Sequence, residues 1–130
     1  MIVAGFGCSS QAATASLYDV FVRMASGTKP DALACLDGRA AWLAPFARQV
    51  GLPLITLKPA QIQGIATPTQ SARIQAAFGT GSVAEACALV VAAGSLHKED
   101  DRRAAAVIAV ARLISQDGQA TGAVARGGGT

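Results

Sequence analysis

Short apolar runs alternate with helical periodicity along the first half of the chain. Residues 1–6, 31–36 and 52–57 are apolar runs of strand length, bounded by glycine, proline or an Asp-Gly pair. Between them lie two sets of apolar residues at helical spacing. These sets are Leu17, Val20, Phe21 and Met24, and then Trp42, Leu43, Phe46 and Val50. This strand–helix alternation is typical of a parallel sheet covered by helices.

The pattern changes after residue 58. Residues 59–62 predict one short helical turn, residues 64–69 a loop, and residues 71–78 a short helix. A longer helix is expected over residues 82–93, and Gly94 ends it. Its start has capping-box spacing: the Ser82 hydroxyl would accept from the Glu85 amide, and the Glu85 carboxylate from the Ser82 amide.

The C-terminal part combines two apolar strands with a polar end. Residues 96–98 and 104–113 read as strands joined by a charged turn at residues 99–103, which predicts a hairpin. From residue 115 the chain is rich in Gly, Ala and polar residues, so we expect a folded domain over 1–114 and a disordered tail over 115–130. The predicted class is a single α/β domain, with a mixed, mostly parallel sheet of about five strands layered by helices.

Composition and charge limit the classes of function that the chain could have. The net charge of +3 is spread over scattered Lys and Arg residues, which argues against a nucleic-acid binder and suits a small acidic ligand or a plain soluble surface. Three separated cysteines and one histidine make a metal site improbable, and no motif calls for a cofactor. The chain shows no signal peptide and no apolar run near the ~18 residues of a membrane span, so we expect a cytoplasmic protein.

The first candidate site follows the first strand. Gly5 and Gly7 would let a ligand approach the backbone, and Ser9 or Ser10 can cap a helix whose N-terminus attracts anions. A dinucleotide-binding loop would need a third glycine here. Cys8 is either a nucleophile, with its thiol pKa lowered by the helix dipole, or a small residue packed on the sheet.

Two further candidates lie in the second half. The hydroxyls of Thr67 and Thr69 could bind a carboxylate, although a turn before a helix cap explains them as well. Gly79, Gly81 and Ser82 would expose amides to an acidic group, or simply end one helix and begin the next.

The remaining candidate site residues are charged and lie near the ends of predicted strands. Arg39 could hold a carboxylate and Asp37 could orient it or act as a base, unless the pair forms a plain surface turn. Lys98 and His97 precede the charged turn, where Lys98 would extend to solvent. The sequence contains no Ser/His/Asp arrangement, paired-carboxylate spacing or phosphate-binding loop.

Several segments together resemble the CobE/CbiG C-terminal family of cobalamin (vitamin B12) biosynthesis, and most closely its stand-alone form. In the family's order these are GFGCSS, ALACLDGRAAWLAPFARQVGLPLITL, the TPT loop, GTGSVAEACAL and HK…AAAVIAVAR. The resemblance implies an α/β domain that acts on an incomplete corrin ring. Two-domain members of the family open a ring lactone of a cobalt-containing precorrin and release acetaldehyde.

Three functions therefore compete. The first is a carrier for a precorrin or a hydrogenobyrinic-acid-type corrinoid, bound by the glycine loops, the TPT loop, Arg39 and Lys98. The second is a lactone-opening hydrolase, for which Cys8, Asp37 and Glu85 are the catalytic candidates. The third is a subunit that completes another enzyme of the pathway.

Overall fold

The computed structural model describes residues 1–94 and 106–127, and at its centre lies a five-stranded sheet. The strands are β1 (Ile2–Cys8), β2 (Ala32–Leu36), β3 (Leu54–Leu57), β4 (Ala106–Ile114) and β5 (Ala120–Gly127). Their order across the sheet is β3-β2-β1-β5-β4. β1, β2 and β3 pair in parallel, and β5 runs antiparallel to both of its neighbours, β1 and β4. The predicted α/β domain with a mixed sheet and a C-terminal hairpin is confirmed.

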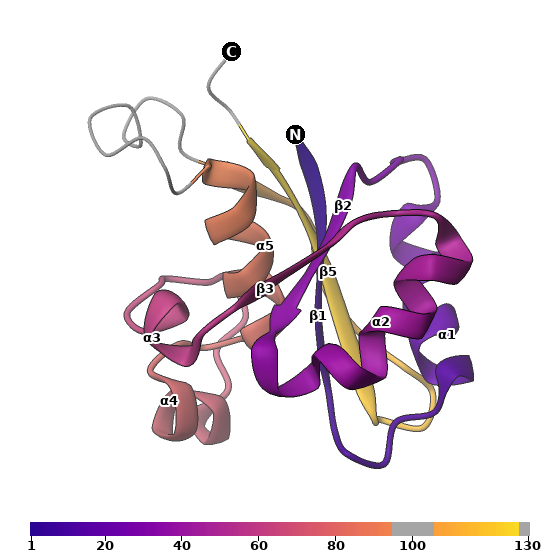
Figure 1. Ribbon diagram of the computed structural model, residues 1–130. Coiled ribbons are helices and arrows are strands. Elements are labelled where there is room, and N and C mark those ends of the chain that lie inside the picture. The colour runs from indigo at the N-terminus through magenta and orange to yellow at the C-terminus, as the bar shows by residue number, and fades with distance from the viewer. Residues whose placement is uncertain (95–105, 128–130) are drawn as a thin grey trace.

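Helices cover both faces of this sheet (Figure 1). On one face lie α1 (Thr14–Ala25) and α2 (Ala40–Val50), and a short 3-10 turn, η1 (Asp37–Arg39), joins β2 to α2. On the other face lie α5 (Val83–Ala93) and the short α3 (Pro59–Ile62), with α4 (Ala72–Phe78) between them in the chain. Alternate residues of the central strands point to opposite faces, so each strand supplies two cores.

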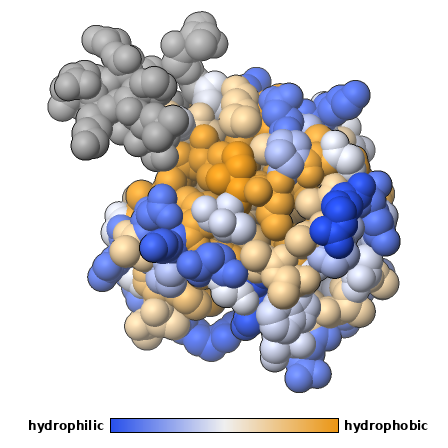
Figure 2. All heavy atoms as spheres, in the orientation of Figure 1, coloured by the Kyte–Doolittle hydropathy of each residue, from blue (hydrophilic) through white to orange (hydrophobic). Residues whose placement is uncertain are grey.

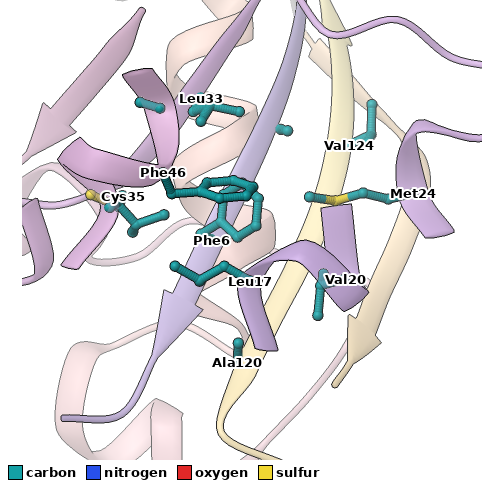
Figure 3. Close-up of a cluster of buried hydrophobic side chains, with 12 residues drawn as sticks. Phe6, Leu17, Val20, Met24, Leu33, Cys35, Phe46, Ala120 and Val124 are labelled. Atoms are coloured by element: carbon teal, nitrogen blue, oxygen red, sulfur yellow. The ribbon is translucent and has the colours of Figure 1, made fainter. Parts of the chain in front are cut away.

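The core under α1 and α2 is built around one aromatic side chain. The ring of Phe46 meets Phe6, Tyr18 and Phe21 edge to face, with centroids 4.9–5.7 Å apart. Phe46 comes from α2 and Phe6 from β1, and Figure 3 shows the two rings together between helix and sheet. Leu17, Val20 and Met24 from α1 fill the neighbouring space, as their helical spacing predicts.

The core under α5 is made of smaller residues. Ala86, Cys87 and Ala88 have no exposed surface and pack on Val3, Ala34 and Ala125 of the sheet. A Cβ atom on Gly5 would lie 2.1 Å from the backbone oxygen of Ala84. The backbone of α5 therefore crosses β1 at a distance that only glycine permits.

The C-terminal segment corrects the prediction of a disordered tail. Residues 120–127 form β5, which lies between β1 and β4, and Ala123, Val124 and Ala125 are fully buried. The small residues that suggested a tail instead make room for helices on both faces. A Cβ on Gly122 would lie 2.4 Å from Val20 Cγ1, and one on Gly127 would lie 2.5 Å from the Ala92 oxygen.

The hairpin also differs from the prediction in its strands. It consists of β4 and β5, joined by residues 115–119, rather than of two strands around residues 99–103. The predicted strand at residues 96–98 and the charged turn lie outside the described residues.

One edge of the sheet is short. β3 has four residues and is followed by Lys58 and Pro59, which limits its pairing with another chain. Figure 2 shows an apolar area on this side of the molecule with polar residues around it.

Among the described helices none alone has the length and apolarity to cross a membrane. Only α4 and α5 taken together pass that test, and they are bent by 57°.

Candidate functional site

A cavity of about 410 Å³ lies at the carboxyl ends of β1 and β2. Its walls come from the ends of these strands, from η1, from the start of α5, from α4 and from the β4–β5 hairpin. In Figure 1 the carboxyl ends of β1 and β2 lie at the lower edge of the sheet. Sheets of this type bind ligands outside the carboxyl ends of their parallel strands, so the cavity is the candidate functional site.

Three arginines are among the residues that line this cavity: Arg39 from η1, Arg73 from α4 and Arg112 from β4. The ion pair of Arg23 with Asp19 is the only one that the structure shows within residues 1–94 and 106–127, so none of the three is neutralised there by a carboxylate. Asp37 is the only acidic residue among the described residues of the wall. The wall therefore carries an excess of two positive charges.

Arg39 is held in place by two contacts. Its Nε donates a hydrogen bond of 2.8 Å to the backbone oxygen of Cys8, and its Cζ lies 5.1 Å from the centre of the Trp42 ring. The cavity wall brings Arg39 and Asp37 together with Cys8. An arginine fixed in this way presents its remaining N–H groups to a ligand at a small cost in entropy.

Cys8 lines the cavity, and its surroundings do not favour the thiolate form. Burial raises the pKa of its thiol, and the nearby Arg39 guanidinium opposes that rise only in part. The predicted activation by a helix dipole is wrong, because α1 begins six residues later, at Thr14. The thiol is therefore protonated at neutral pH.

The other candidate residues between positions 5 and 10 make contacts within the protein. Ser9 and Ser10 do not cap a helix, since the N-cap position of α1 is Ala13. The Ser9 hydroxyl donates instead to the side chain of Gln119 and accepts from the Gln11 amide. Gly5 and Gly7 lie within β1 rather than in a loop, and Gly5 serves helix packing. Of residues 5–10, four line the cavity: Phe6, Gly7, Cys8 and Ser9.

Glu85 is fully buried and binds the protein's own backbone. Its carboxylate accepts hydrogen bonds from the Thr69 amide (2.8 Å), the Thr69 hydroxyl (3.0 Å) and the Arg112 amide (2.9 Å). The predicted capping box forms only in part. Ser82 Oγ accepts from the Glu85 amide at 3.3 Å, but the Glu85 side chain turns to these three donors. We therefore assign Glu85 a structural role.

The TPT loop is likewise satisfied internally. The Thr67 hydroxyl donates to the Thr69 oxygen at 2.8 Å, and Thr69 gives both of its donors to Glu85. Gly81 packs against this loop, because a Cβ there would lie 2.4 Å from the Thr69 oxygen, and Gly79 ends α4 with a positive φ of 73°. From these two segments only Ser82 is part of the cavity wall.

Sequence reasoning missed Arg73 and Arg112. Arg112 is the one charged residue in a strand that is otherwise apolar, which is a signal that could have marked it. Arg73 carries no such signal, because an exposed arginine on a short helix is ordinary. His97 and Lys98 lie outside the described residues. Within 1–94 and 106–127, no three His, Cys, Asp or Glu side chains are grouped so that they could hold a metal ion.

The fold and the cavity define a small α/β protein with an arginine-lined site at the carboxyl ends of the parallel strands of a mixed sheet. The chain belongs to the family described as cobalamin synthesis G C-terminus, whose sequence profile matches residues 2–125. It is therefore a protein of cobalamin biosynthesis, as its sequence motifs predicted. A comparison with curated protein sequences gives no match.

Solved structures agree with this family. The chain is similar to CobE, a protein from the cobalamin (vitamin B12) biosynthetic pathway, with 26% identity, a TM-score of 0.77 and coverage of 97% of this chain and 89% of CobE. It is also similar to cobalamin biosynthesis protein chiG from Agrobacterium tumefaciens, with 26% identity, a TM-score of 0.66 and 98% of both chains covered. A putative cobalamin biosynthesis protein G homolog from Sulfolobus solfataricus shares the fold, with 16% identity and a TM-score of 0.65. That match covers 95% of this chain and 36% of the homolog.

Proposed function

We propose that this protein binds an anionic corrin or precorrin intermediate in the cavity and carries it between enzymes of the pathway in the cytoplasm. The observation that supports this most is the composition of the cavity wall, which contains three arginines, Arg39, Arg73 and Arg112, and one acidic residue, Asp37. Early corrinoids carry many acetate and propionate groups. Arginine binds carboxylates through two parallel hydrogen bonds, so the two chemistries are complementary.

The surroundings of the three catalytic candidates support a hydrolase less well than the cavity wall supports a carrier. The Cys8 thiol is protonated at neutral pH, and the Glu85 carboxylate is buried and engaged by three donors of the protein. Asp37 is exposed in the cavity wall, so a ligand in the cavity could reach its side chain. A hydrolase that uses Asp37 is therefore the second candidate function.

The test is an absorbance titration of the purified protein with hydrogenobyrinic acid and earlier precorrins, followed by mass analysis of the ligand. Binding with unchanged mass supports a carrier. Affinity should fall between low and moderate salt, because exposed charges are screened over about 10 Å at 0.1 M salt. Failure of every corrinoid to bind would reject the proposal and favour a subunit role, which co-purification with another pathway enzyme would reveal.

Matched variants locate the binding site. Arg39→Gln and Arg112→Gln each remove one charge from the cavity wall, and Arg48→Gln removes one from the exposed end of α2, outside that wall. A hydrogen bond to a charged group contributes about 1.5–3 kcal/mol, so each cavity variant should weaken binding by about tenfold or more. Equal effects of all three variants would place the ligand elsewhere. A change in ligand mass that Asp37→Asn abolishes would establish the hydrolase instead.

A further inference from the structure

The cavity is small compared with a corrin ring. Pockets of about 300–1,000 Å³ enclose drug-sized ligands, and this one measures about 410 Å³. A tetrapyrrole-derived macrocycle with its acid side chains is larger than such a ligand. If the cavity receives a corrinoid, only one edge of the molecule, with the side chains on that edge, enters it.

The three arginines come from parts of the chain that are far apart in sequence. Arg39 follows β2, Arg73 lies at the start of α4, and Arg112 lies near the end of β4. Ile74, Phe78 and Val83 provide partly exposed apolar surface in the same wall. The wall thus pairs cationic groups for carboxylates with apolar surface for the methylene groups that link each carboxylate to the ring.

Guanidinium groups distinguish a carboxylate from the amide of the same shape. Arginine has five N–H donors and no acceptor. A carboxylate meets two of these donors with two acceptor oxygens, whereas a carboxamide brings one acceptor and one NH2 group that faces a donor. The amide also lacks the charge that strengthens each bond. Discrimination of this kind is strong, because the polar groups of the site are left unpaired by the wrong ligand.

We propose that the cavity selects the edge of a corrinoid whose side chains are free carboxylates, and that Arg39, Arg73 and Arg112 discriminate these acids from the corresponding amides. This specificity rests on the proposed function, since it assumes that a corrinoid is the ligand. It predicts that conversion of the side chains to amides releases the molecule from the protein.

The experiment compares two ligands on one set of proteins. Hydrogenobyrinic acid and the same ring with its side chains converted to carboxamides are titrated into the unchanged protein and into Arg39→Gln, Arg73→Gln and Arg112→Gln. Two or more lost charge-assisted bonds correspond to about a hundredfold in affinity, so we expect the acid to bind at least that much more tightly than the amide. Each cavity variant should reduce acid affinity about tenfold or more and leave the weak binding of the amide nearly unchanged. Arg48→Gln should change neither affinity.

Charge and geometry are separated by Arg73→Lys, which keeps the charge of an exposed helix residue and removes the two-pronged donor set. We expect this variant to bind the acid with an affinity between those of the unchanged protein and Arg73→Gln. Equal affinity for acid and amide, with variants that weaken both alike, would overturn the selectivity while the proposed function stands. No binding of hydrogenobyrinic acid to the unchanged protein would overturn the proposed function itself.

Discussion

Glycine 5 sits where α5 crosses β1, and its missing side chain sets the distance between helix and sheet. A Cβ at this position would lie 2.1 Å from the Ala84 oxygen and 2.8 Å from the Ala88 amide nitrogen, both backbone atoms that cannot move aside cheaply. Gly5→Ala should therefore destabilise the protein by about 1–3 kcal/mol through overpacking. Urea unfolding followed by circular dichroism measures this loss.

The matched control is Gly38→Ala. A Cβ on Gly38 would have no atom within 4 Å, and the residue has no positive φ, so the added methyl group has room. We expect its unfolding free energy to stay within about 0.5 kcal/mol of the unchanged protein. Equal stability of the two alanine variants would show that α5 can move away from β1.

Asp117 gives the β4–β5 turn a dependence on pH. Its carboxylate accepts from Ser115 Oγ (2.6 Å), Ser16 Oγ (2.5 Å) and the Gln119 amide (3.0 Å), and these hydrogen bonds lower its pKa. A lowered pKa in the folded state means that the stabilisation is complete above the unfolded pKa of about 3.9. It is lost as the pH falls through the folded value.

The prediction is that Asp117→Asn is less stable than the unchanged protein at pH 7 and that this difference shrinks below about pH 4. Thermal unfolding of both proteins from neutral pH down to about pH 2.5, below the unfolded pKa, tests it. A stability difference that stays constant across this range would mean that the ionised carboxylate is not what anchors the turn.

At the scale of elements, Glu85 joins three of them. Through its carboxylate, α5 is tied to the TPT loop at Thr69 and to β4 at Arg112, whose side chain lines the cavity. Glu85→Gln keeps the shape but turns one acceptor into an NH2 group, which faces a donor. We expect a loss of about 1–3 kcal/mol in unfolding free energy, because a buried polar group is left unpaired.

Asp37→Asn makes the same chemical change at an exposed position and should leave stability within about 0.5 kcal/mol. Hydrogen exchange gives a second measurement: the Thr69 and Arg112 amides should exchange faster in Glu85→Gln. Unchanged protection at both amides would show that the carboxylate does not hold these elements together.

At the scale of the whole molecule, the C-terminal strand decides whether the sheet exists. β5 pairs with β1 from Cys8 to Ile2 and with β4 on its other side, so its removal separates β4 from the rest. A chain that ends at Leu113 should fail to form a cooperatively folded domain, whereas one that ends at Gly127 keeps every described strand and should fold. A sharp thermal transition in the shorter chain would mean that β5 is dispensable.

Local sequence signals were sufficient to predict the elements of the first half of the fold and the capped start of α5. The apolar runs and helical stripes up to residue 57 predict β1, β2, β3, α1 and α2, because burial on one or both sides leaves a pattern in the sequence itself. Ser82 marks the N-cap of α5 for the same reason, since capping is a contact between residues three apart. The order of the motifs along the chain likewise identified the family.

The rest was decided by contacts between distant residues. The small residues from Ala120 to Gly127 look like a flexible tail until helices are placed on both faces of the strand that they form. The Glu85 carboxylate has three donors within reach only because Thr69 and Arg112 are brought beside it. Arg39, Arg73 and Arg112 are far apart in the sequence. They belong to one cavity wall because the fold brings η1, α4 and the end of β4 to the same edge of the sheet.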